Sequence, residues 1–271
     1  MLWLCLSLLP AKGSANEPPD LQKSEWKLKE LFARTGQIHS DFEKSVIADS
    51  LSDLLYETLQ MPGSFDYPFS LLNSLGKIKS QDQKIRIYTW NIPDLYGTNA
   101  CYGFLQYKTT KNSEFRVLRL TDKKALITDP AMATLTADNW YGCLIYAIIE
   151  KKLSGITCYT LLGYNSENLF ISKKIIDILW FNDQDEPVWG KAVFRYQNRL
   201  QNRILFEYSA KVNMSLQWNQ KMNMIIFDHL SPSKPSYTGN YQFYGPDFSY
   251  DGLEVVNGYW DLVEDIDIRN K

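Results

Sequence analysis

The sequence predicts a mainly β fold: an antiparallel meander that closes as a curled sheet, a barrel or a sandwich, with an N-terminal amphipathic helix. From about residue 77 onward, apolar residues alternate with polar ones, which is the period of a half-buried strand. The connections at 182–187 and 219–221 are too short for the crossover helix that parallel strands need. Asn257-Gly258, between two apolar runs, is typical of a two-residue antiparallel hairpin.

The helix is expected over residues 41–60. Ser40 and Glu43 form a capping box, apolar residues follow at helical spacing, and Met61-Pro62-Gly63 ends the pattern. Its leucines at 51, 54, 55 and 59 form one stripe, which we expect to pack on the sheet. A shorter helix is indicated between Trp26 and Phe32.

Ten strands are expected after the helix, each bounded by turn residues. They cover residues 84–91, 101–108, 115–120, 141–151, 156–164, 174–181, 188–194, 203–210, 214–218 and 222–228. A loop rich in Ser and Pro follows, and the hairpin 253–262 then completes the domain. The predicted organisation is an export signal at 1–15, a helical region at 16–76, the main β domain at 77–230, and the loop and C-terminal hairpin at 231–271.

Residues 1–15 resemble an export signal. An apolar run from Leu2 to Leu9 is too short to span a membrane, and Gly13-Ser14-Ala15 offers small residues for cleavage before Asn16. We therefore expect a periplasmic or surface-exposed protein with no transmembrane span in the mature chain. After cleavage three cysteines remain, Cys101, Cys143 and Cys158, and buried free thiols are expected.

The charge balance limits the partners. With 29 basic and 31 acidic residues and no long block of one sign, the chain lacks the concentrated basic surface that nucleic acids require. Aromatic residues make up 14% of the chain, a share that fits strands and also fits a stacking surface for sugars or peptides.

Several motifs resemble those of a group of uncharacterised exported proteins of Bacteroidetes-type bacteria, over roughly residues 60–268. The segments that carry the resemblance are 74–78, 85–91, 159–164, 226–232 and 243–247. The resemblance implies an envelope or secreted location, and it implies no activity and no catalytic residues.

Catalytic candidates are few. Asp177 and Glu207 lie within strongly apolar strands, where burial would raise the pKa of a carboxyl group and suit the general acid of a glycosidase. His229, flanked by Asp228 and Ser231, is a weaker candidate, because neighbouring residues of a strand point to opposite faces.

An aromatic groove formed by Trp180, Trp189 and Tyr208 is the candidate binding surface. The leading hypothesis is an exported envelope protein that binds a glycan, a peptide or a partner protein through an aromatic-rich β surface. The alternatives are a secreted, glycosidase-like hydrolase that uses buried carboxylates, and a structural or assembly protein.

No cofactor is expected, apart from weakly bound Ca²⁺ at one loop. Asp247, Ser249 and Asp251, followed by Gly252, match the first half of a calcium loop, and Glu254 would add a ligand from the following strand. The second half of the motif is missing, so the alternative is a plain turn stabilised by the two aspartates.

Overall fold

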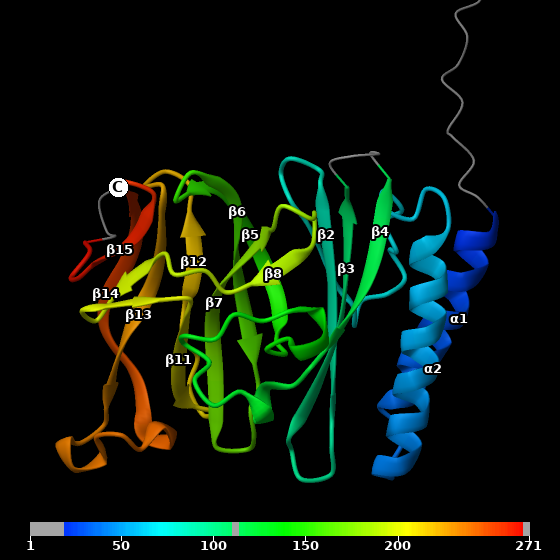
Figure 1. The fold of residues 1–271 in the computed structure, drawn as a ribbon. Coiled ribbons are helices and arrows are strands. Elements are labelled where there is room, and N and C mark those ends of the chain that lie inside the picture. Colours follow the sequence, from blue (N-terminus) through cyan, green and yellow to red (C-terminus); the bar gives the residue numbers. More distant parts are fainter. Residues whose placement is uncertain (1–18, 110–113, 268–271) are drawn as a thin grey trace, which may run out of the picture.

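The computed structural model describes residues 19–109 and 114–267, and it confirms a mainly β, antiparallel fold with a helical N-terminal region (Figure 1). The predicted export signal lies outside these residues. The helices are α1 (Pro19–Thr35) and α2 (Asp41–Gln60), with short 3₁₀ turns η1 (Lys124–Leu126), η2 (Ala137–Asn139), η3 (Pro235–Tyr237) and η4 (Tyr241–Phe243). None of the helices in this part of the chain combines the length and apolarity needed to cross a membrane.

The strands form three sheets. Sheet 1 has the order β1-β2-β3-β4, with β1 (Gly76–Lys79), β2 (Ile85–Pro93), β3 (Asn99–Lys108) and β4 (Phe115–Thr121). Sheet 2 has the order β11-β7-β6-β5, with β5 (Leu144–Leu153), β6 (Ile156–Asn165), β7 (Ile171–Phe181) and β11 (Arg203–Ser209), and β8 (Pro187–Trp189) pairs with β7. Sheet 3 has the order β10-β9-β15-β14-β13-β12, with β9 (Phe194–Tyr196), β10 (Arg199–Gln201), β12 (Leu216–Asn219), β13 (Met224–Pro232), β14 (Tyr244–Val256) and β15 (Tyr259–Val263).

The helices and the sheets stack as four layers, in the order helices, sheet 1, sheet 2, sheet 3 (Figure 1). One hydrophobic cluster fills each of the three spaces between neighbouring layers. Of the closures left open by the sequence, the molecule therefore adopts a sandwich, with three sheets instead of two.

Alternation along β2 explains how sheet 1 serves two cores. Ile85 and Ile87 belong to the cluster shared with sheet 2, whereas Tyr88 and Trp90 belong to the cluster under the helices. Successive side chains of a strand point to opposite faces, so a single strand can supply both layers.

Helix α2 begins as the sequence predicts. Ser40 is its N-cap and accepts a hydrogen bond from the Glu43 backbone N–H. Leu51, Leu55 and Leu59 are fully buried against sheet 1, and full burial of a leucine stabilises by about 1.5 to 3 kcal/mol. The first helix is much longer than expected: α1 covers 17 residues and packs against α2.

The C-terminal hairpin is confirmed in detail. Val256 pairs with Tyr259 across Asn257 and Gly258, which have φ angles of 51° and 80°, as a type I′ turn requires. One pair departs from the antiparallel prediction, because β15 and β9 run parallel over a short stretch. The strand predicted at 188–194 is divided at Gly190, whose φ is 85° and where a Cβ would lie 2.5 Å from the Ala133 carbonyl.

Candidate functional site

A β-bulge between β13 and β14 exposes His229. The register between β13 and β14 shifts between Asp228 and Leu230, and on the other strand Phe248 has a φ of 74°. Bulges turn a side chain away from the regular alternation of a strand. The imidazole is consequently about half exposed, whereas the flanking residues Asp228 and Leu230 are partly buried.

His229 and Asp251 form a dyad. The imidazole Nδ1 lies 2.7 Å from Asp251 Oδ2, and Asp251 Oδ1 accepts a hydrogen bond of 3.2 Å from the Asp265 backbone N–H. Asp251 is buried, so its carboxylate fixes the orientation of the ring and leaves Nε2 free of the pair. Asp247 Oδ2 lies 4.0 Å from that Nε2.

Three carboxylates influence the charge of His229. The hydrogen bond to Asp251 raises the pKa of the imidazole above its ordinary value of 6.5, and the charges of Asp251, Asp247 and Asp265 act in the same direction. Partial burial acts against them. The site therefore favours the protonated imidazole, which donates from both ring nitrogens.

A pocket of about 180 Å³ lies beside the dyad, between sheets 2 and 3, and we term it the His229 pocket. Its floor is a cluster of three rings, Tyr196, Phe206 and Phe227, in which Phe206 and Phe227 have centroids 4.7 Å apart. Tyr241 of η4 and Tyr244, the first residue of β14, have centroids 5.0 Å apart and also line the pocket.

Tyr196 keeps its proton in this setting. Burial raises the pKa of its phenol to about 12, and the nearby charges of Asp251 and Glu264 contribute to the shift. The phenol is therefore neutral at physiological pH, so its O–H can donate a hydrogen bond. The pocket thus presents aromatic faces and the neutral hydroxyl of Tyr196 beside the charged pair of His229 and Asp251.

The predicted calcium residues lie on β14 and not in a loop. Asp247 Oδ1 accepts hydrogen bonds from both the backbone N–H and the hydroxyl of Ser249, at 3.1 and 2.7 Å, while Asp251 binds His229. Glu254 lies further along the strand, paired with Met224 and Asp261. Residues 19–109 and 114–267 hold no group of three or more His, Cys, Asp or Glu side chains arranged for a metal ion. Asp247 thus satisfies donors of Ser249 on the same strand, and Asp251 is engaged by the imidazole.

The two predicted catalytic carboxylates are both paired with basic residues. Burial raises the pKa of Asp177, as the sequence predicts, although Arg203 Nε donates to its Oδ2 at 2.7 Å and opposes the shift. Glu207 is partly exposed and forms an ion pair of 2.9 Å with Lys173. Register places Asp177 opposite Arg203 and Glu207 four residues further along β11, so roughly 13 Å separates the two positions. Glycosidases need their carboxyl groups within about 10 Å of each other, across an open cleft.

The predicted aromatic groove is not assembled. Trp189 is buried in the core between sheets 1 and 2, and Tyr208 is buried in the core between sheets 2 and 3. Trp180 is partly buried; its indole N–H donates to the Gly190 carbonyl, and the Lys191 ammonium lies 4.4 Å from its ring centroid. These three side chains share no exposed surface on which a sugar could stack.

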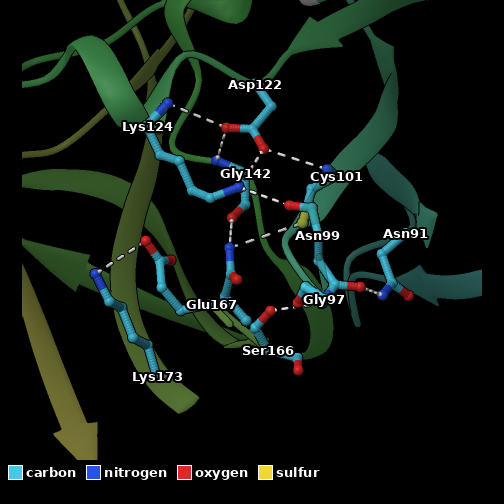
Figure 2. Close-up of polar contacts among 11 residues, drawn as sticks. Asn91, Gly97, Asn99, Cys101, Asp122, Lys124, Gly142, Ser166, Glu167 and Lys173 are labelled. Atoms are coloured by element: carbon cyan, nitrogen blue, oxygen red, sulfur yellow. Dashed lines mark hydrogen bonds and ion pairs between the residues drawn. The ribbon is translucent and has the colours of Figure 1, made fainter. Parts of the chain in front are cut away.

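A second polar cluster joins sheets 1 and 2 (Figure 2). The Asp122 carboxylate accepts hydrogen bonds from the backbone N–H groups of Cys101 and Gly142, and Lys124 Nζ lies 2.8 Å from it. Asn165 donates to the Gly142 carbonyl at 2.6 Å. These hydrogen bonds join the ends of strands in sheets 1 and 2, and we assign the cluster a structural role.

Cys101, Cys143 and Cys158 are buried and unpaired, as the sequence predicts. Cys101 lies within the second polar cluster, and burial raises the pKa of its thiol to about 12. A protonated thiol is a poor nucleophile, so this cysteine is not poised for catalysis.

Sequence reasoning found His229 and Asp251 but did not find Tyr196, Tyr241 or Tyr244. The segments 226–232 and 243–247 lie side by side as β13 and β14, which brings Tyr244 close to His229. Compared with protein-family models, with curated proteins and with solved structures, the chain matches none of them.

Proposed function

We propose that the protein is an exported binding protein of the cell envelope, and that the His229 pocket holds one sugar ring of a glycan. Export rests on the signal-like residues 1–15. The observation that carries the ligand class is the combination of an aromatic floor with a charged mouth, formed by His229 and Asp251. Ligand sites typically combine apolar walls with a few placed polar groups.

The chemistry of the pocket matches a sugar on two sides. Aromatic faces pack against the C–H groups of a pyranose, and the hydroxyl groups of the ring donate to carboxylates or accept from a protonated imidazole. A volume of about 180 Å³ is below the roughly 300 to 1,000 Å³ of pockets for drug-sized ligands. One ring of a longer glycan is therefore the expected occupant, and the remainder of the chain would lie outside the pocket.

Saturation-transfer NMR with pools of free monosaccharides tests this function. We expect transfer to at least one sugar with the wild type, and its loss in Tyr241→Ala and in Asp251→Asn. Tyr96→Ala is the matched control, because Tyr96 is 80% exposed and does not line the pocket. Pools of short peptides form the comparison arm. Transfer to peptides alone, to no compound, or equally in wild type and Tyr241→Ala would refute sugar binding.

The dyad itself supports a second candidate, a hydrolase in which His229 acts as the general base. An aspartate at Nδ1 orients the imidazole and stabilises its protonated form, as in Asp-His pairs of hydrolases. Ser249, the serine beside the dyad on β14, donates its hydroxyl to Asp247 instead of His229, so binding is the first choice. Turnover of chromogenic glycosides or esters that is abolished by His229→Gln would reverse the ranking.

A further inference from the structure

Exposed apolar side chains gather at one end of the layered sheets. Of the sixteen large hydrophobic residues that are exposed in the described chain, nine lie on five segments at the lower edge of Figure 1. We term these segments the turn rim: 41–46, 94–98, 166–170, 210–213 and 233–243. The nine residues are Phe42, Val46, Leu95, Tyr96, Leu169, Phe170, Val212, Tyr241 and Phe243.

The first two contacts that make the turn rim continuous join α2 to the turns of sheets 1 and 2. Asp41 Oδ1 accepts a hydrogen bond from the Leu95 backbone N–H at 3.0 Å, which ties the start of α2 to the β2–β3 turn. That turn contacts the β6–β7 turn, because a Cβ on Gly97 would lie 2.5 Å from Leu169 Cδ2.

Two further contacts extend the turn rim to sheet 3. The Ala210 backbone N–H donates to the Phe170 carbonyl at 2.9 Å. Val212 lies beside Gly245, because a Cβ placed on Gly245 would be 3.4 Å from Val212 Cγ2. The turns therefore cross all four layers. Layer spacings of about 10 Å give a band roughly 30 Å long.

Charge on the turn rim is low and mixed. Its basic residues are Lys44, Lys211 and Lys234, and its acidic residues are Asp41, Glu43, Asp94 and Glu167, for a sum of 3 − 4 = −1. A surface that attracts anionic lipids or nucleic acids would need a basic excess. The complementary surface is therefore apolar and without net charge.

We propose that the turn rim docks on the surface of a lipid bilayer of zwitterionic headgroups. Its apolar residues stand on separate turns, so each tip can enter the headgroup boundary while polar residues between them stay hydrated. Tyrosines and other aromatics favour that boundary, because one end of the ring is apolar and the other is wet. A flat bilayer also accommodates a long band of spaced tips, whereas a protein partner would require a matching contour.

Cosedimentation with phosphatidylcholine vesicles tests the proposal. We expect binding of the full mature chain, with no gain when phosphatidylglycerol is added or the salt is lowered. Leu95→Ser/Tyr96→Ser should reduce the partition coefficient by about tenfold or more, since the depth of insertion depends on the apolar area buried. Leu169→Ser/Phe170→Ser should do the same from another layer, so the test does not depend on the folding of one variant.

The matched control is Leu126→Ser, because Leu126 is 76% exposed and lies outside the turn rim. Its partition coefficient should equal that of the wild type. Failure of the wild type to bind vesicles, or equal losses in the control and the turn-rim variants, would overturn the proposal. A gain with anionic lipid would also overturn it. Light scattering measures the oligomeric state in solution. If the wild type does not bind vesicles but forms a dimer, and Leu95→Ser/Tyr96→Ser dissociates that dimer, the occupant is a second copy of the chain and the lipid proposal is wrong.

Discussion

Removing one partner of the buried pair Asp177–Arg203 is expected to be among the most costly polar changes in this protein. The Arg203 side chain is 0% exposed and that of Asp177 is 5% exposed, and Nε lies 2.7 Å from Oδ2. Asp177→Asn keeps the size of the side chain and removes its charge, which leaves the guanidinium buried and uncompensated. Measured cases of this kind cost about 3 to 5 kcal/mol.

The magnitude translates into a clear thermal shift. For domains of this size, 1 kcal/mol changes the melting temperature by about 2 to 4 °C, so Asp177→Asn should lower it by roughly 6 to 20 °C. Replacing both partners, in Asp177→Asn/Arg203→Met, removes the isolated charge and should recover most of the loss. Glu207→Gln is the control, because its pair with Lys173 is partly exposed, and it should cost about 1 kcal/mol or less.

Urea denaturation of the wild type, Asp177→Asn, Arg203→Met, the double variant and Glu207→Gln measures these free energies of unfolding, and the first four proteins complete the double-mutant cycle that gives the coupling energy. The reasoning is wrong if Asp177→Asn unfolds within about 1 kcal/mol of the wild type. It is equally wrong if the double variant loses the sum of the two single losses, because the two charges would then not be coupled.

Three further outcomes follow from the core, the second polar cluster and the dyad. Leu55→Ala should cost about 2 to 5 kcal/mol in urea denaturation, because the Leu55 side chain of α2 is fully buried against sheet 1; a loss below 1 kcal/mol would show that this face of α2 is not part of the core. Gly142→Ala should lower the melting temperature by several degrees, since its Cβ would lie 2.2 Å from the Asp122 carboxyl carbon; an unchanged value would contradict that contact. In an NMR titration the His229 imidazole should lose its proton above pH 6.5, and Asp251→Asn should lower that midpoint. The pair of His229 and Asp251 contributes its full stability below about pH 6.5, and this contribution is lost as the pH rises through the raised pKa of His229. If the difference in free energy of unfolding between the wild type and Asp251→Asn grew with pH, the predicted direction would be wrong.

Local signals predicted the elements well. Ser40 with Glu43 begins α2, and Asn257-Gly258 forms the hairpin turn, because capping and positive φ are properties of a few adjacent residues. The length of α1 was underestimated, since its apolar residues are few and its exposed face includes Trp26. Tertiary packing against α2 stabilises that helix, and packing is not visible in a short window.

The number of sheets was not predicted, and this explains the failure of the aromatic groove. Sheet 2 is covered on both faces, and doubly buried strands appear as nearly continuous apolar runs, such as Ile175 to Leu179, which only the buried Asp177 interrupts. If each strand is assumed to have one solvent-exposed face, Trp189 and Tyr208 are expected at the surface. In the molecule each lies in a different core, so neither can contact a ligand outside.

The His229 pocket was only half predictable for a related reason. His229 and Asp251 meet through strand pairing of β13 and β14, but Tyr196 comes from β9, which reaches this place through the parallel pair with β15. No periodicity in the sequence specifies that pairing. Residues that are distant along the chain become neighbours only once the order of strands in sheet 3 is known.

The pocket is built mainly on strands β9, β11, β13 and β14, whereas the turn rim lies mainly on the segments that connect the strands, and the two share Tyr241. The rigid layers hold those connecting segments in place, and connecting segments commonly carry recognition. The two proposals are nevertheless separable. Asp251→Asn changes the pocket and no residue of the turn rim, whereas Leu95→Ser/Tyr96→Ser changes the turn rim and no residue of the pocket. Loss of sugar binding alone in the first variant and of vesicle binding alone in the second would assign two independent surfaces to one end of the molecule.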